Sequence, residues 1–146
     1  MNYYAASFGT PTTELPKQRA APTKSDDPTE HQLQVKVINW WNKSCEGYKL
    51  PAFALYAVPN GGSRHMLEAV GLKEEGVRKG IPDLQMDVAR GQYHGLRIEM
   101  KRAKGVVSPE QKEVHQFLAG QGYRIIVAFT SQEAINAIDD YLTDGK

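Results

Sequence analysis

Hydrophobic and polar residues alternate on both sides of a short turn in the segment from Gly80 to Lys101. Apolar side chains occupy every second position, at Leu84, Met86 and Val88 and then at Leu96, Ile98 and Met100. The positions between them are polar: Asp83, Gln85 and Asp87, followed by Arg97, Glu99 and Lys101. A period of two is typical of a strand with one face in the core. The segment therefore predicts an antiparallel hairpin that turns at residues 90–92 and exposes its polar face to solvent.

The same alternation restricts the register between the two strands of this hairpin. Leu84 and Ile98 can both enter the core only if the numbers of directly opposed residues add to an even number. A sum of 182 sets Asp83 opposite Glu99, and a sum of 184 sets Asp83 opposite Lys101. Opposed Cβ atoms lie about 4.5–5.5 Å apart, and two carboxylates at that distance repel unless a cation or a proton intervenes. The core thus brings Asp83 towards Glu99 and Lys101.

Apolar residues recur with helical spacing in three other segments. A helix is expected from a Thr29 cap to about Lys43, with apolar positions at Leu33, Val37, Ile38, Trp40 and Trp41. A second begins at Ser108, with Gln111 in the capping-box position and a buried stripe of Val114, Phe117 and Leu118. A third follows a cap at residues 130–133, with its stripe at Ala134, Ile135, Ile138 and Leu142. A short helix is also expected over residues 63–72.

Two apolar runs complete the expected elements. Residues 51–58 read as a strand that ends in a loop at Asn60, Gly61 and Gly62, and residues 123–129 read as a buried strand. The predicted order is helix, strand, short helix, strand, strand, helix, strand, helix. This order predicts an α/β fold with a mixed sheet flanked by helices and a crossover after Lys101.

Length and composition limit the class of protein. The chain of 146 residues is 40% hydrophobic and 24% charged, which suits one globular domain. Residues 1–28 hold four of the eight prolines and show no periodicity, so we expect a flexible arm followed by one domain at 29–146. The N-terminus lacks the apolar stretch of a signal peptide, and no run is long enough to span a bilayer. With one cysteine, Cys45, which cannot form an internal disulfide, a protein of the reducing cytoplasm is expected; a phage or bacterial context is expected as well.

The net charge of +1 argues against a protein that coats nucleic acid non-specifically. Its distribution is uneven, because residues 64–104 hold nine Lys and Arg against six Asp and Glu. The glycine-rich loop at residues 60–62 exposes backbone N–H groups that could receive a phosphate, although ordinary turns have the same composition. The excess of basic residues at 64–104 is compatible with the binding of a phosphate group near the hairpin.

Asp83 followed by the Glu99-Met100-Lys101 triplet resembles the signature of PD-(D/E)xK nucleases. The wider pattern is similar to their virus-type replication-repair branch, the VRR-NUC domain. The matching elements span roughly residues 29 to 130: Glu30, the loop at 60–62 with Arg64, the Gly80-Ile81-Pro82-Asp83 run, the triplet, and Ser108 with Gln111. Each is weak alone, but their order and spacing together are fairly specific. The resemblance implies a restriction-endonuclease-like core.

The resemblance also implies a role for each matching residue. Asp83 and Glu99 would hold a catalytic Mg²⁺ or Mn²⁺, with the backbone carbonyl of Met100 and with Glu30 as a further ligand, direct or through water. Lys101 would position the attacking water, and Gln111 would hydrogen-bond near it. From spacing alone, Glu30 is a first-turn charge on a helix dipole and Gln111 is a capping residue; each could serve both purposes.

Five basic residues are candidates for contacts with a DNA backbone: Arg64, Arg78, Lys79, Arg102 and Lys104. A solvated surface explains any one of them equally well. No two histidines have the spacing of a zinc site. His115 lies one helical turn beyond Gln111 and could line the cleft, but packing is the favoured role.

The leading hypothesis is a metal-dependent DNA endonuclease. By analogy with stand-alone members of the resembled family, it acts on branched DNA such as four-way junctions, and a homodimer would match the two-fold symmetry of a junction. Two alternatives stay open: a non-catalytic DNA-binding module with the same fold, and a metal-dependent phosphoesterase that acts on small nucleotides.

Overall fold

The computed structural model of this chain describes residues 26–59 and 71–143. Four strands form one mixed sheet in the order β1-β2-β3-β4: β1 (Leu55–Ala57), β2 (Leu84–Met86), β3 (Gly95–Met100) and β4 (Tyr123–Ala128). The first three are antiparallel neighbours, and β4 runs parallel to β3. Parallel neighbours need a crossover, and helix α3 (Pro109–Gly120) supplies it. The predicted α/β class with a mixed sheet is confirmed.

The hairpin of β2 and β3 has the even register that the hydrophobic alternation required. Leu84 lies opposite Ile98 and Met86 opposite Leu96, so that each pair adds to 182. The turn lies where it was predicted, closed by reciprocal backbone hydrogen bonds between Arg90 and Tyr93 at 3.0 and 2.9 Å. Continued by one residue beyond β2, this register places Asp83 opposite Glu99.

Within residues 26–59 and 71–143, the long helices α1, α3 and α4 accompany the sheet. Helix α1 (Glu30–Ser44) starts at a capping box between Thr29 and Gln32, and α3 starts at a second one between Ser108 and Gln111. Helix α4 (Ser131–Thr143) begins after Thr130, whose hydroxyl accepts a hydrogen bond from the Glu133 N–H at 3.1 Å. These caps satisfy backbone donors that helices otherwise leave unpaired. The predicted starts of the helices at Thr29, Ser108 and Thr130 are therefore confirmed, and each follows from contacts between residues close in the sequence.

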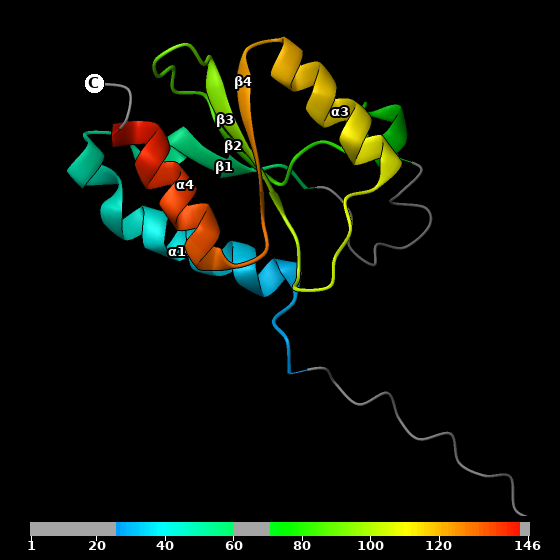
Figure 1. Cartoon of the computed structure of the whole chain (residues 1–146), viewed down its shortest axis with the longest axis horizontal. Helices are drawn as coiled ribbons and strands as arrows, with labels where there is room; N and C mark the ends of the chain where they lie inside the picture. Colours follow the sequence, from blue (N-terminus) through cyan, green and yellow to red (C-terminus); the bar gives the residue numbers. More distant parts are fainter. Residues whose placement is uncertain (1–25, 60–70, 144–146) are drawn as a thin grey trace, which may run out of the picture.

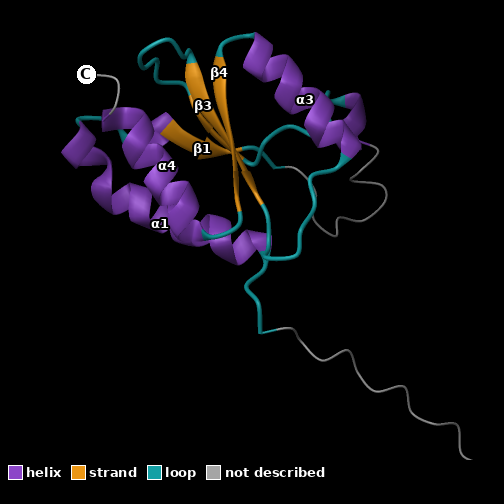
Figure 2. Ribbon diagram, in the orientation of Figure 1, coloured by secondary structure: helices purple, strands orange, loops and turns teal. Residues whose placement is uncertain are grey.

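Helices α1 and α4 lie together on one side of the sheet and α3 lies on the other (Figures 1 and 2). The hydrophobic core fills the first of these two layers. It joins Leu33, Val37 and Trp41 of α1 and Ala134, Ile138 and Leu142 of α4 to the apolar positions of β2 and β3. The indole N–H of Trp41 donates to the carbonyl of Ala52 at 2.7 Å. One face of the hairpin is thus committed to packing and the other is left for polar groups.

The structure corrects the expectation that the polar face of the hairpin is solvated. Every residue of β3 is buried, and Arg97, Glu99 and Lys101 are 5%, 1% and 7% exposed. Charged groups are almost never buried this deeply unless they are paired. This polar face is therefore covered by neighbouring groups, among them Gln111 and His115 of α3, instead of being exposed to solvent.

Three expected elements also differ from the observed ones. The strand expected to be buried at 123–129 is β4, an edge strand of intermediate exposure. Its apolar composition alone could not predict its position in the sheet. Phe117 was placed in a buried stripe but is 64% exposed, since α3 turns other side chains to the sheet. Of the range 51–58 where a strand was expected, only Leu55–Ala57 forms the strand β1, and a 3-10 turn at Ala52–Ala54 precedes it.

Some predictions concern residues outside the described ranges. The arm at 1–28 falls there except for residues 26–28, and so does most of the short helix expected at 63–72. Residues 71 and 72 of that range are helical, and the helical stretch continues to residue 74. The division into arm and domain stays a prediction. In the described parts of the chain, no helix combines the length and the apolar character that crossing a membrane requires.

Candidate active site

Three charged side chains meet on the polar face of the hairpin, at the end where β2 begins and β3 stops. Asp83 immediately precedes β2, Glu99 lies near the end of β3, and Lys101 directly follows it. The Lys101 Nζ atom lies 3.0 Å from Oε1 of Glu99. The register of the sheet explains this meeting, because residues of odd number on both strands point to the same face.

Asp83 is held by the backbone of the neighbouring strands. Its Oδ2 accepts a hydrogen bond from the Met100 N–H at 2.8 Å, and its carbonyl accepts one from the Val58 N–H at 2.9 Å. Burial, followed by the negative charge of Glu99, raises the pKa of the Asp83 carboxyl from 3.8 to about 6; the Met100 N–H and Lys101 oppose this shift. A half-buried carboxyl beside a buried one is the expected setting for such a rise.

Glu99 has partners from both the sheet and the covering helix. Lys101 and the side-chain amide of Gln111 both approach its Oε1, the amide donating at 2.5 Å. The Nε2 of His115 lies 3.4 Å from its Oε2. Burial raises the pKa of the Glu99 carboxyl, and the hydrogen bond and charge of Lys101 oppose the rise. Glu99 is therefore the most deeply enclosed group of the site.

Gln111 combines the two roles that the sequence left open. Its Oε1 accepts the Ser108 N–H at 2.8 Å as part of the capping box, while its Nε2 donates to Glu99. Glu30 lies in the first turn of α1, with Oε1 3.8 Å from the Lys101 Nζ. Lys101 thus lies between Glu99 and Glu30, and the starts of α1 and α3 both reach the site.

Of the two roles considered for His115, the favoured one, packing, is wrong: the ring lines the site, with Nε2 3.4 Å from Oε2 of Glu99. The signal was present in the sequence, since His115 lies four residues after Gln111 and so shares its helix face. Burial, and then the charge of Lys101, lower the pKa of His115, while Asp83 acts in the opposite direction.

Gly80 sets the approach of the Asp83 segment to α3. Its φ is +84°, and a Cβ at this position would lie 2.7 Å from the carbonyl oxygen of Glu110 and 3.1 Å from the backbone nitrogen of Gln111. Only a residue without a side chain fits such a contact. The glycine of the Gly-Ile-Pro-Asp run therefore lets the first turn of α3, which carries Gln111, dock against the segment that carries Asp83 and leads into β2.

A second polar cluster continues along the same face of the sheet. The Arg97 Nη2 atom lies 2.8 Å from Oδ1 of Asp87, and the Tyr56 hydroxyl donates to Oδ2 of Asp87 at 2.6 Å. The guanidinium lies over the ring of Tyr123 at 4.1 Å from its centroid. The cluster joins all four strands beside the site and pairs a buried arginine, as burial of a charge requires. Sequence inspection placed Arg97 on this face but did not find its partners.

Four of the five basic candidates for DNA contact lie at the surface near the site. Arg78 and Lys79 precede Gly80, and Arg102 and Lys104 follow Lys101; all four are exposed. The backbone turns just there, since the Gly105 N–H donates to the carbonyl of Arg102 at 2.7 Å. Arg64 lies outside the described residues. Exposed cations on both segments that enter the site suit contacts with a phosphate backbone.

The carboxylates fit a hard divalent cation that is bound by few protein ligands. Within residues 26–59 and 71–143, no cluster of three or more His, Cys, Asp or Glu side chains is placed to hold a metal ion. Mg²⁺ commonly takes only one or two carboxylates together with waters and substrate phosphates. The Asp83 and Glu99 pair meets that demand. Burial raises the pKa of both carboxyls, and the charge of Glu99 adds to the rise at Asp83; a bound cation would favour the ionised form of both.

Comparison with known proteins identifies the family. The family model of the VRR-NUC domain matches residues 24–132. A solved structure described as a VRR_NUC domain protein is similar to this chain with a TM-score of 0.69 and 34% identity, over 82% of this chain and 93% of that one. No match was found among curated proteins. The family match extends over Glu30, Asp83, the Glu99-Met100-Lys101 triplet and Gln111, and the chain is thus a member of the VRR-NUC family of nuclease-type domains.

Proposed function

We propose that this protein is a Mg²⁺- or Mn²⁺-dependent DNA endonuclease that hydrolyses phosphodiester bonds to leave 5′-phosphate and 3′-hydroxyl ends. The observation that carries the proposal is the meeting of half-buried Asp83 with the buried Glu99 and Lys101. Two carboxylates with raised pKa values meet an ammonium group in a place that the sheet register specifies. Burying such charges is costly, and a packed core alone would not require them.

Asp83 and Glu99 would hold the ion, with the Met100 carbonyl and Glu30 as further oxygen donors. When bound, a divalent ion lowers the pKa of a coordinated water and stabilises charge that develops on phosphate oxygens. Lys101 holds the attacking water and favours its deprotonation. Gln111, fixed by its capping box, keeps the Glu99 carboxylate in place. The enclosure of Glu99 and Lys101 excludes bulk water and strengthens these electrostatic interactions.

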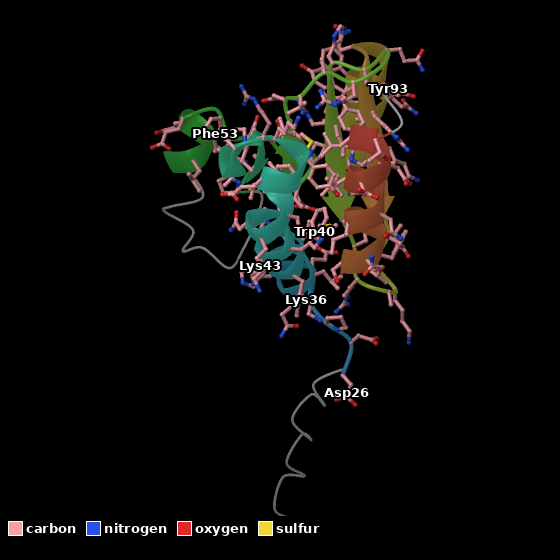
Figure 3. The ribbon with its side chains drawn as sticks, turned by 90° about the vertical axis from the view of Figure 1, so that its left-hand side faces the viewer. Asp26, Lys36, Trp40, Lys43, Phe53 and Tyr93 are labelled. Carbon is pink, nitrogen blue, oxygen red and sulfur yellow. The ribbon has the colours of Figure 1, made fainter. Side chains whose placement is uncertain are left out.

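The first test is cleavage of linear, flapped and four-way DNA in Mg²⁺ or Mn²⁺ by the wild type and by Lys101→Ala. We expect the variant to lose about 10²–10³-fold in rate, the scale for removing one preorganised contact to a transition state. Lys43→Ala is the matched control, because Lys43 is an exposed residue in the last turn of α1 and lies away from the sheet (Figure 3). It should cleave like the wild type.

The outcomes of this test separate the proposed activity from its alternatives. Binding of DNA without cleavage in either metal would indicate a non-catalytic DNA-binding module. Cleavage of small nucleotide esters but of no DNA would indicate a phosphoesterase. Equal rates for Lys101→Ala and the wild type would remove the proposed role of Lys101.

We further propose that the substrate is branched DNA, such as a four-way junction, and that the working form is a homodimer. The exposed cations around the site, Arg78, Lys79, Arg102 and Lys104, supply contacts that position DNA without reading its sequence. A junction has two-fold symmetry, so two copies related by the same symmetry would present one site to each of two strands.

The dimer predicts a solution mass of about twice that of the 16.3 kDa chain at micromolar concentration. Light scattering after size-exclusion chromatography measures it, and a mass near that of one chain over this range would rule the dimer out. The junction preference is measured separately, as the ratio of cleavage rates on four-way and linear DNA of the same sequence. A ratio near one would contradict it.

A further inference from the structure

Helix α3 presents two polar side chains, one turn apart, to the two oxygens of a single carboxylate. Gln111 donates to Oε1 of Glu99 at 2.5 Å, and the His115 Nε2 atom lies 3.4 Å from Oε2. Residues four apart on a helix lie on the same side, so one helix face meets both ends of the carboxylate. The Glu99 side chain, which is 2% exposed, therefore has little freedom to rotate while α3 stays docked.

His115 has a chemical partner where an apolar residue would serve for packing alone. Its side chain is 12% exposed; of the partly buried apolar residues of α3, Val114 directly precedes it and Leu118 lies three residues after it. Burial of a polar ring is unfavourable unless a hydrogen bond compensates for it. The contact with Oε2 supplies that compensation, and it directs the ring towards the group that the proposed function makes a metal ligand.

We propose that His115 is a positioning residue that orients the Glu99 carboxylate by donating its Nε2–H to Oε2 and thereby sets the affinity of the site for a divalent cation. The inference rests on the proposed function, because Glu99 must be a ligand for its orientation to matter. His115 acts through Glu99 and touches neither the ion nor the DNA. Partners of this kind behind a metal ligand are worth about 10–100-fold in metal affinity or activity.

The test measures Mn²⁺ binding by isothermal titration calorimetry, without DNA, at a temperature where circular dichroism shows every variant folded. The proteins are the wild type, His115→Ala, His115→Gln and His94→Ala. Glutamine keeps a side-chain N–H of similar reach, as Gln111 shows one turn earlier. His94 is the matched control because it is exposed and its ring packs edge-on against Tyr123 instead of Glu99.

We expect His115→Ala to weaken Mn²⁺ binding about 10–100-fold, with His115→Gln and His94→Ala within about threefold of the wild type. Cleavage by His115→Ala should return close to the wild-type rate at saturating Mn²⁺. If His115 acts only through metal affinity, its loss raises the Mn²⁺ concentration needed for half-maximal activity and leaves the maximal rate unchanged. Unchanged Mn²⁺ affinity in His115→Ala would overturn the inference. Equal weakening in the Ala and Gln variants would also overturn it, since the donated hydrogen bond would then have no part.

The same titration distinguishes failure of the inference from failure of the proposed function. A wild type that binds neither Mn²⁺ nor Mg²⁺ and cleaves no DNA would overturn both. A wild type that binds Mn²⁺ and cleaves DNA, with an alanine variant of equal affinity, would overturn the role of His115 alone.

Discussion

Replacing Asp83 by asparagine should abolish DNA cleavage and, above pH 6, make the metal-free protein more stable. Asparagine keeps an oxygen that can accept the Met100 N–H, now bonded at 2.8 Å. It removes the charge that burial and Glu99 disfavour. We expect cleavage to fall by at least about 10²–10³-fold, because the proposed ion loses an anionic ligand.

The direction of the stability change follows from proton linkage. The Asp83 carboxyl has a pKa of about 6 in the folded protein, against 3.8 for an ordinary aspartate. Between these values the folded state binds a proton that the unfolded state has released, so the free energy of unfolding falls as the pH rises. That stability is fully present below pH 3.8 and is lost as the pH passes through 6. The asparagine side chain cannot ionise, so the Asp83→Asn variant should not show this loss.

Thermal unfolding in EDTA at pH 4 and at pH 8 measures this effect. We expect Asp83→Asn to gain about 1–2 kcal/mol over the wild type at pH 8, less than the full linkage because solvent reaches part of the carboxyl. At pH 4 the two proteins should differ little. A variant less stable than the wild type at pH 8 would show that the Asp83 charge is favourable in the fold, contrary to our account of the site.

Asp87→Asn is the matched control, four residues away on the same face. Hydrogen bonds from Tyr56 and Arg97, together with the charge of Arg97, lower the pKa of Asp87, with burial as an opposing cause. A lowered pKa contributes stability that is present above the ordinary aspartate value and lost as the pH falls through the folded value. The same substitution should therefore destabilise the protein at pH 8. Opposite signs at these two positions would identify Asp83 as the one held at a cost to stability.

The part of the site that lies within one hairpin was predictable, because the core and the site share one register. Leu84 can pair with Ile98 only if Asp83 faces the side of Glu99, so the apolar residues determine where the acidic ones point. The helix starts at Thr29 and Ser108 were predictable for a similar reason, since a capping box is a contact between residues three apart.

The contacts made between distant elements were not predictable in this way. The stripe on α3 was taken from its apolar residues and so included Phe117, yet the helix turns Gln111 and His115 to the sheet. A helix that covers a polar face turns polar residues inward, so its apolar residues do not mark its inner side; the four-residue spacing of Gln111 and His115 was the signal for that side. The edge position of β4 is a further example, because strand order depends on all four strands together.

The Gly80→Ala substitution should lower both the stability of the protein and its rate of DNA cleavage, although Gly80 has no proposed catalytic role. A Cβ here would meet the Glu110 carbonyl oxygen at 2.7 Å and its carbon at 2.8 Å, at a backbone φ of +84°. Alanine at positive φ costs about 1 kcal/mol, and overpacking adds about 1–3 kcal/mol. We therefore expect a loss of about 2–4 kcal/mol in the free energy of unfolding, measured by urea denaturation.

Gly76→Ala separates the two contributions. Gly76 also has a positive φ, +94°, but a Cβ there would meet nothing within 4 Å. It should lose only the conformational term of about 1 kcal/mol and cleave DNA normally. Gly80→Ala, by contrast, must push the first turn of α3 away from the Asp83 segment and move the Gln111 amide from Glu99. Its cleavage rate should fall about 10–100-fold at a temperature where it is still folded. If Gly80→Ala and Gly76→Ala prove equally stable and equally active, the docking of α3 on Gly80 does not hold the site together.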